Sequence, residues 1–286
     1  MAANKGGVWT EIGGLAGLLG GRGFAAALFL NAVFSLALIH LRAEPIFDAP
    51  PSLAEAGKGD FPAFWRAGEM ALGGNAAQAY DPAAFRSGFG EDGQGLLFLN
   101  PPQFFLLIWP FSLLSYGVAK SAWLVLNALA LAAVAVLAGR GRTQTGLFLV
   151  FLALSPAAFA AFLPAQVSPL VAAGLLAAMI LAKERPIAAG LLLALLTAKP
   201  QYAMLVPVFL AARGEWRAFA AAAVLSLLFA ALSFFVLGAQ AWTAFFGALG
   251  GEHLSHAELL MRDMVTVHQT AGKLGAGPAA RMAAQL

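Results

Sequence analysis

One carboxylate and one ammonium group stand out in this sequence as side chains that could do chemistry. Asp60 lies in the segment Lys58-Gly59-Asp60-Phe61-Pro62 of a polar loop, and Lys199 interrupts a later apolar stretch. A carboxylate can accept the proton of an attacking hydroxyl, and a cation can bind a phosphate. We therefore take Asp60 as a candidate catalytic base and Lys199 as a candidate phosphate-binding residue.

Each of these two residues also has a plainer interpretation. Residues 61–70 have the pattern of a short amphipathic helix, and Asp60 would be its N-cap, a role that stabilises a helix start by about 1 kcal/mol. Capping and base catalysis do not exclude each other. An ammonium near bilayer depth costs at least about 2.5–3.5 kcal/mol. Lys199 therefore either faces a wet cavity that holds a phosphate or extends to a lipid headgroup.

Five further polar residues are candidates for substrate or loop contacts. Gln166 and Ser168 lie between two apolar stretches and could donate hydrogen bonds to a sugar or a phosphate, although helix-linking turns contain such residues routinely. Arg66, Tyr80 and Asp81 belong to the polar loop and could contact an acceptor. Tyr80 and Asp81 stand next to Pro82 in a turn-forming segment, so we expect them to fix the loop rather than to catalyse.

The C-terminal segment supplies the last candidates. His253, His256 and Arg262 could contact an acceptor from a tail that follows the last apolar stretch. The spacing of the two histidines would allow a metal site, but neighbouring acids provide no clear third ligand. We expect no metal and no cofactor.

The amino-acid composition indicates the class of protein to which these candidate residues belong. The chain of 286 residues is 60% hydrophobic and 11% charged, with a formal net charge of +3 and no cysteine. Such a composition is typical of a polytopic all-α membrane protein surrounded by membrane lipids, because a spanning segment must be helical or part of a closed barrel. The small net charge does not indicate a nucleic-acid partner, and the absence of cysteine excludes disulfides.

The apolar stretches predict one domain over residues 1–286. A first span at 23–41 is long enough to be a retained anchor rather than a signal peptide. A polar loop at 42–98, a helical bundle at 99–237 and a tail at 238–286 follow it. The spans predicted within the bundle are 119–138, 145–163, 167–182, 186–212 with a break at Lys199-Pro200-Gln201, and 218–237.

The basic residues predict which ends of these spans are cytoplasmic. Three pairs, Arg140 with Arg142, Lys183 with Arg185 and Arg213 with Arg217, join the spans and should all lie inside. The polar loop, residues 164–169, the Lys199 break and the tail then lie outside together. Residues 103–116 are expected to form an interfacial or re-entrant segment, the alternative being two crossings.

The ordered motifs of the chain resemble those of glycosyltransferase family 87, a group of GT-C membrane enzymes. They are Gly59-Asp60-Phe61, Ala67-Gly68, Leu72-Gly73-Gly74, Tyr80-Asp81, Asn100-Pro101-Pro102, Ala165-Gln166-Val167, Ala189-Gly190 and Ala198-Lys199-Pro200-Gln201. This resemblance implies a polyprenyl-phosphate sugar donor, typically of mannose, and transfer at the outer face of the membrane. We expect a lipid or glycan acceptor and a bacterial inner membrane, and we expect inversion because the sequence positions no second carboxylate as a nucleophile. The resemblance also implies that Asp60 is the base and that Lys199 lies by the donor phosphate. Ala165 stands where the family commonly has glycine.

Two other classes of protein remain as alternatives. A transporter or flippase for a lipid-linked substrate could use the broken helix at Lys199 as a site near the membrane midplane, although the sequence shows no inverted repeat. A non-catalytic membrane subunit would tolerate replacement of Asp60. An assay of sugar transfer separates both from an enzyme.

Overall fold

The computed structural model describes residue 53, residues 59–90, 96–139, 142–153 and 155–250, and isolated residues between 271 and 283. The predicted first span at 23–41 lies outside the described residues. So do His253, His256 and Arg262.

Every described element is a helix, which confirms the predicted all-α class. A first group comprises α2 (Asp60–Leu72), η2 (Ala76–Tyr80), α3 (Pro82–Arg86) and α4 (Gln103–Ser112). The second comprises α5 (Tyr116–Ala138), α6 (Arg142–Ala153), α7 (Pro156–Phe162), α8 (Ser168–Leu181), α9 (Pro186–Leu196), η4 (Pro200–Tyr202), α10 (Val206–Ala212) and α11 (Trp216–Gly250).

Two of the described helices, α5 and α11, are long and apolar enough to cross a membrane. The 23 residues of α5 rise about 35 Å, which exceeds the roughly 30 Å of a hydrocarbon core. The 10 residues of α4 rise only about 15 Å, and Pro110 lies near the end of that helix. This length fits the predicted interfacial or re-entrant segment, and the number of crossings stays a prediction.

The other predicted spans differ from single long helices. Residues 145–163 are divided between α6 and α7, because Ser155 caps α7 through a hydrogen bond from the Ala158 amide and Pro156 opens the new helix. The predicted span 167–182 is the 14-residue α8. The break predicted at Lys199-Pro200-Gln201 is confirmed, since α9 ends at Leu196 and α10 begins at Val206.

Helix α11 has a break at the point where the sequence predicted the end of the last span. Gly238 has φ 81° and ψ 165°, outside the helical region, and the chain then continues helically to Gly250. Helix α11 packs against η2 and α4, and its segment after Gly238 takes part in the contact with η2. The ring of Phe245 in this segment lies 5.8 Å from that of Tyr80, measured between centroids.

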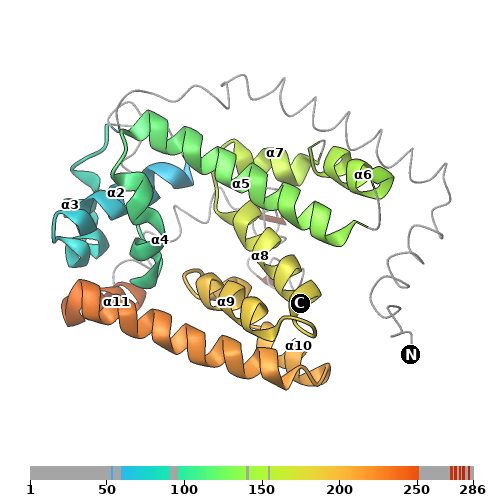
Figure 1. Ribbon diagram of the computed structural model, residues 1–286. Helices are drawn as coiled ribbons and strands as arrows, with labels where there is room; N and C mark the ends of the chain where they lie inside the picture. Colours follow the sequence, from blue (N-terminus) through green and yellow to red (C-terminus); the bar gives the residue numbers. More distant parts are fainter. Residues whose placement is uncertain are drawn as a thin grey trace.

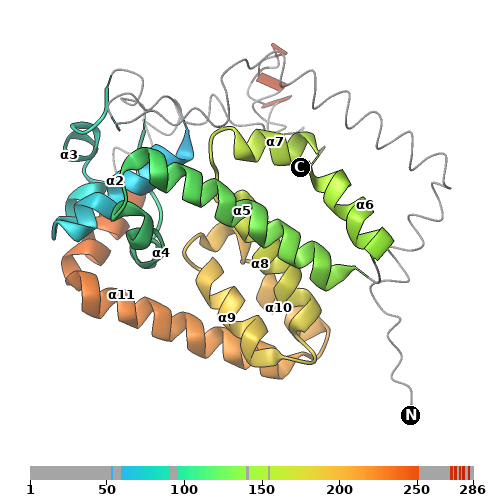
Figure 2. The same ribbon diagram turned by 45° about the horizontal axis from the view of Figure 1, so that its top comes forward.

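The long helices α5 and α11 lie on opposite sides of α8 and α9 in Figures 1 and 2. Between them α8 packs against α5 and α9, and α9 packs against α11. Gly190 allows the closest of these approaches, because a Cβ at this position would lie 2.6 Å from the Ala221 Cβ. Helices α2, α3 and α4 gather at one end of this arrangement, where the polar loop folds back onto the bundle.

An aromatic cluster joins α2 to the bundle. Phe61 is fully buried, and its ring centroid lies 5.7 Å from that of Trp123 in α5. Phe64, one turn further along α2, lies 4.8 Å from Phe104 in α4 by the same measure. Burial of rings of this size stabilises by roughly 1.5–3 kcal/mol each, so α2 is held firmly against α4 and α5.

Candidate active site

Asp60 is the first residue of α2, not its cap. The N-cap is Gly59, and no side chain accepts a capping hydrogen bond there. The predicted capping role for Asp60 is therefore wrong, because the helix begins one residue earlier than a capping aspartate requires. Its carboxylate lies in the first turn, where the helix dipole favours a negative charge. The Asp60 side chain therefore does not cap α2.

The turn between α7 and α8 holds the start of α2 in place. The amide of Asp60 donates a 2.9 Å hydrogen bond to the Pro164 carbonyl, and the indole Nε1 of Trp123 donates one of 3.0 Å to the Ala165 carbonyl. A Cβ at Gly59 would lie 3.0 Å from the Pro164 oxygen, so glycine permits this close approach. The turn thereby connects α2 to α5.

Ala165 adopts a left-handed conformation in this turn, with φ 52°. Glycine reaches this region without steric cost, whereas a residue with a Cβ does so only where the surroundings compel it. The position is the one at which the resemblance to glycosyltransferase family 87 implied glycine. The structure therefore gives a backbone reason for that preference.

Gln166 and Ser168 lie just after this turn and contact each other. The Ser168 hydroxyl donates a 3.0 Å hydrogen bond to Oε1 of Gln166. The Leu170 amide donates one of 3.2 Å to Oδ1 of Asn127, a fully buried residue of α5. These contacts position the start of α8 close to the turn that holds Asp60.

Lys199 lies in the break between α9 and η4, where it faces α2. Its Nζ atom is 5.5 Å from the ring centroid of Phe64 and 5.9 Å from that of Tyr202. Both distances suit cation–π attraction. Among the described carboxylates, none lies within ion-pair distance of this ammonium. The cation is thus held by aromatic rings beside the first turns of α2.

The electrostatics of Asp60 and Lys199 are coupled. Burial raises the pKa of the Asp60 carboxyl, and the Lys199 ammonium acts against this by lowering it. A raised pKa makes a carboxylate a stronger base, while the cation keeps it ionised over a wider pH range. The structure therefore brings together the two residues that sequence analysis singled out as base and phosphate ligand.

Arg66, Tyr80 and Asp81 make contacts that organise the loop. Arg66 pairs with Glu69 at 2.7 Å between Nη1 and Oε2. The Tyr80 hydroxyl donates a 2.8 Å hydrogen bond to the Asn100 carbonyl, and burial raises the pKa of this tyrosine. Asp81 caps α3 by accepting a 2.7 Å hydrogen bond from the Ala84 amide.

Among the described residues, no group of three His, Asp or Glu side chains could hold a metal ion.

Sequence analysis missed three polar residues that shape this region. Trp123 and Asn127 hold the turn and the start of α8, and Gln103 in α4 donates a 3.2 Å hydrogen bond from Nε2 to the Thr197 carbonyl. Asn127 and Gln103 are amides within apolar helices. An amide that must be satisfied inside such a helix is a signal of a specific interhelical contact.

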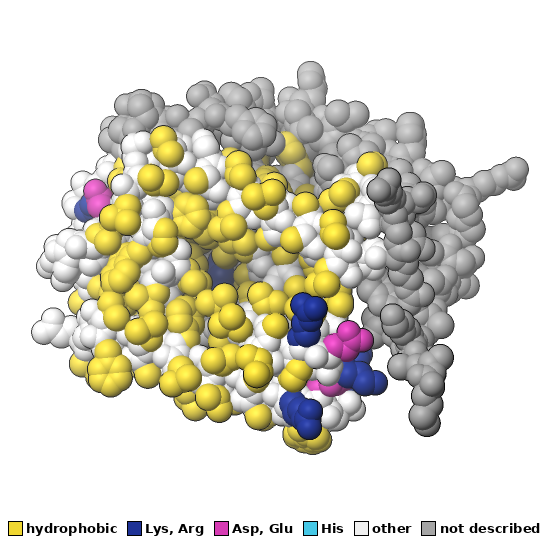
Figure 3. Space-filling view, in the orientation of Figure 1, with side chains coloured by type: hydrophobic (Ala, Val, Ile, Leu, Met, Phe, Trp, Pro, Cys, Tyr) yellow, Lys and Arg dark blue, Asp and Glu magenta, His cyan; other side chains and the backbone are white. Residues whose placement is uncertain are grey.

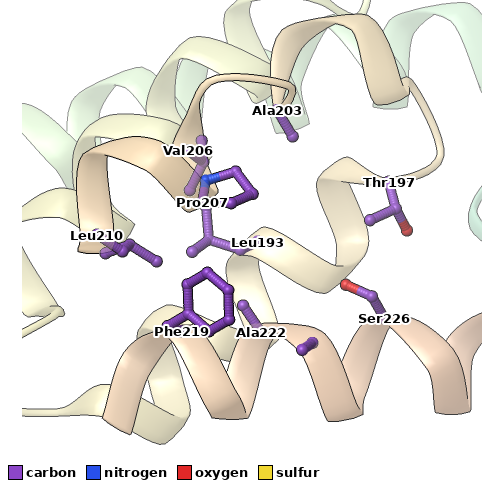
Figure 4. A pocket seen from close by; sticks show the side chains of 10 residues that line it. Leu193, Thr197, Ala203, Val206, Pro207, Leu210, Phe219, Ala222 and Ser226 are labelled. Carbon is purple, nitrogen blue, oxygen red and sulfur yellow. The ribbon is translucent and has the colours of Figure 1, made fainter. Parts of the chain in front are cut away.

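An apolar pocket of about 140 Å³ lies between α9, α10 and α11 (Figure 4). Its wall includes Leu193, Pro207 and Phe219, with the side chains of Thr197 and Ser226 at one end. Thr197 is two residues from Lys199, so the pocket adjoins the helix break. An apolar pocket at this place suits a hydrocarbon chain rather than a sugar.

One face of the molecule is largely hydrophobic (Figure 3). A hollow near its centre has a basic side chain at its bottom, and the hollow is framed by hydrophobic side chains. Charged side chains gather at the end of this face where the α8–α9 and α10–α11 turns lie. The α8–α9 turn contains Lys183 and Arg185, and the α10–α11 turn contains Arg213, with Arg217 just after it in α11; these are two of the three basic pairs predicted to share a side.

Comparison with known proteins identifies one family. The model of glycosyltransferase family 87 matches residues 98–277, which is more than half of the chain. The match includes Gln103, Gln166 and Lys199, whereas Asp60 precedes it. No curated protein and no solved structure shows a significant match.

Proposed function

The chain belongs to glycosyltransferase family 87, and from this premise we propose that it transfers a hexose, preferably mannose, from a polyprenyl-phosphate donor to an acceptor hydroxyl. Family membership makes it a membrane glycosyltransferase; the donor, the acceptor and the orientation belong to the proposal. The observation that carries the proposal is the position of the Lys199 ammonium at a helix break, 5.5 Å from the ring of Phe64 in α2, the helix that begins with the partly buried carboxylate Asp60.

The proposed reaction is a single displacement at the anomeric carbon. The acceptor oxygen forms the new bond to this carbon while Asp60 takes the hydroxyl proton. The bond from the anomeric carbon to the phosphate oxygen breaks, and its electron pair leaves with the polyprenyl phosphate. Lys199 stabilises the charge on that leaving group. One displacement inverts the anomeric configuration, which gives this enzyme the inverting GT-C type of chemistry.

The apolar pocket between α9, α10 and α11 supports a lipid-linked donor. A phosphate at Lys199 carries its prenyl chain into the region next to the helix break, and Thr197 at the end of α9 belongs to the pocket wall. Burial of hydrocarbon contributes about 25 cal/mol per Å² of apolar surface. The wall is almost entirely apolar, which suits hydrocarbon better than the nucleotide part of a nucleotide sugar.

The acceptor is a lipid or a glycan in this proposal. It approaches from the side of the loop that carries Arg66, Tyr80 and Asp81, and the segment with His253, His256 and Arg262 provides further contacts. Gln166 and Ser168, which are hydrogen-bonded to each other beside the α7–α8 turn, contribute to binding of the donor sugar.

We place the site on the extracytoplasmic side of a bacterial inner membrane. The charged α8–α9 and α10–α11 turns, which share one end of the molecule in Figure 3, then face the cytoplasm. The chain has no cysteine, so a single Cys introduced at position 60 reports the side directly. Labelling from outside intact cells by an impermeant thiol reagent is expected, and labelling only from the cytoplasmic side would overturn this orientation.

The decisive test of the function is sugar transfer in proteoliposomes that contain the whole chain. Synthetic polyprenyl-phosphate mannose is supplied with a lipid or glycan acceptor, and nucleotide-linked mannose serves as the control donor. Transfer that depends on Asp60 and on the prenyl-linked donor supports the proposal. Movement of the donor across the bilayer without transfer would instead indicate the flippase alternative, which the broken helix at Lys199 also suits.

A further inference from the structure

The first residue of α4 is connected to the helix break that carries Lys199. Gln103 is buried, with 6% of its surface exposed. Its Nε2 donates a 3.2 Å hydrogen bond to the carbonyl of Thr197. Thr197 follows the last residue of α9, and Lys199 comes two residues later. A side chain from a different helix therefore fixes the backbone from which the ammonium extends.

Other hydrogen bonds also hold the end of α9. The last carbonyls of a helix have no partners within it and need them from elsewhere. The amide of Lys199 bonds to the Leu196 carbonyl, and the Thr197 hydroxyl donates back to the Ala194 carbonyl at 2.6 Å. These bonds are local to the helix end. Of these hydrogen bonds, the one from Gln103 connects the break to another helix, and so to the rest of the site.

The other half of the Gln103 amide is unsatisfied. Its Oε1 is buried and accepts no hydrogen bond from the described groups. A buried acceptor without a partner is a cost to the folded state, whereas an apolar side chain of the same shape carries none. If this position served stability alone, an apolar side chain would therefore suit it better than the amide of Gln103. The amide fits a role in which the direction of one hydrogen bond matters more than its contribution to folding.

We propose that Gln103 is a positioning residue for the transferase reaction: its hydrogen bond to the Thr197 carbonyl sets the helix break so that the Lys199 ammonium meets the donor phosphate. This inference rests on the proposed function. Gln103 itself touches neither reacting atom. It acts through the backbone of residues 197–199.

A double-mutant cycle tests the proposal in proteoliposomes with synthetic polyprenyl-phosphate mannose. Gln103→Met keeps the length of the side chain and removes the hydrogen bond. We expect kcat/KM for the donor to fall about 10-fold, the size of one lost hydrogen bond. In the Lys199→Met background the same change should cost less than about 2-fold, because the cation that Gln103 positions is already gone. An equal loss in both backgrounds would overturn the proposal.

Ser112→Ala provides the matched control. Ser112 is also buried in α4, and its hydroxyl donates a 3.1 Å hydrogen bond to the Trp65 carbonyl of α2 instead of to the break. We expect this variant to change kcat/KM less than about 2-fold. A loss as large as that of Gln103→Met, with the same dependence on Lys199, would assign the effect to α4 packing and refute a specific role for Gln103.

A measurement without turnover separates this proposal from the proposed function. In the variant Lys199→Cys the introduced thiol is the single thiol of the chain, and its rate of alkylation reports the exposure of the break. Gln103→Met should change that rate at least about 5-fold, in line with loss of one hydrogen bond, and Ser112→Ala should not. Gln103→Asn, which keeps the amide but shortens its reach, is held to the same criterion if Gln103→Met fails to fold. Unchanged alkylation would overturn the positioning role even in an active enzyme, whereas a changed rate with no sugar transfer would count against the proposed function alone.

Discussion

Replacement of Asp60 by asparagine separates the chemistry of this residue from its structural effect. Asp60→Asn preserves the shape of the side chain but removes its ability to take a proton. Loss of a general base lowers turnover on the order of 10² to 10⁴-fold. The family match begins after this residue, so the assignment of the base depends on the geometry at the start of α2 and needs this test.

The structure also gives the expected effect on stability. Asp60 makes no capping hydrogen bond, so the substitution forfeits none. It loses a favourable interaction of the charge with the helix dipole, about 0.3–1 kcal/mol. In return it removes the cost of a partly buried charge. Since burial raises the pKa of Asp60 in the folded state, the folded protein binds more protons than the unfolded chain between the two pKa values, and stability falls as pH rises through that window.

Above that window the ionised Asp60 therefore destabilises the fold, and asparagine does not. The two effects oppose each other at neutral pH, and we expect the free energy of unfolding to change by less than about 1 kcal/mol. At about 2–4 °C per kcal/mol for chains of roughly this size, Tm should move by only a few degrees. Turnover in proteoliposomes and thermal melting in detergent are measured on the same preparations. Near wild-type turnover in Asp60→Asn, or a loss of turnover that is matched by unfolding, would refute the assignment of Asp60 as the base.

Three further substitutions test the site and its frame. Lys199→Met removes the charge that lowers the pKa of Asp60, so the acidic limb of the kcat/KM profile should move to higher pH; an unmoved or lowered limb contradicts the coupling. Gly59→Ala places a Cβ 3.0 Å from the Pro164 oxygen and should reduce turnover about 10-fold by shifting Asp60, and wild-type kinetics would show that the turn does not position the base. Gly190→Leu forces α9 away from Ala221 and should cost about 1–3 kcal/mol in thermal melts, whereas Gly247→Ala in α11, which meets no atom within 4 Å, should cost nothing comparable.

The class of the fold could be predicted from the sequence because apolar stretches leave a strong local signal, and the same kind of signal made Asp60 and Lys199 candidate site residues. Apolar stretches predict helices in a membrane, and the Lys199-Pro200 pair predicts the observed break because proline cannot continue a helix. Asp60 and Lys199 attract notice as charges in unusual surroundings. The prediction that Asp60 and Lys199 lie near each other came only from the expectation that both face the same side of the membrane. The contact of Lys199 with Phe64 of α2 gives this prediction a definite geometry.

What sequence reasoning missed depends on contacts between distant helices. The division of residues 145–163 into α6 and α7 depends on Ser155, which caps α7, and on Pro156, which begins it. Neither residue is conspicuous within an apolar stretch of this length. The roles of Trp123 and Gln103 follow from carbonyl groups of turns that lie 42 and 94 residues away in the chain. Hydrogen bonds to backbone carbonyls carry no complementary residue type, so no pattern in the sequence pairs the two partners.

The attachment of α2 to the bundle limits how the loop can be exchanged between related enzymes. Its first amide is docked on Pro164 and its first aromatic ring on Trp123, so the loop is fitted to partners that belong to a different stretch of the chain. In a chimera that receives only a foreign segment around Asp60, this carboxylate would be attached to a turn and a helix that it does not fit. Grafting experiments that aim to alter acceptor choice should therefore transfer residues 164–166 and the Trp123 position together with the loop, as a single unit of exchange.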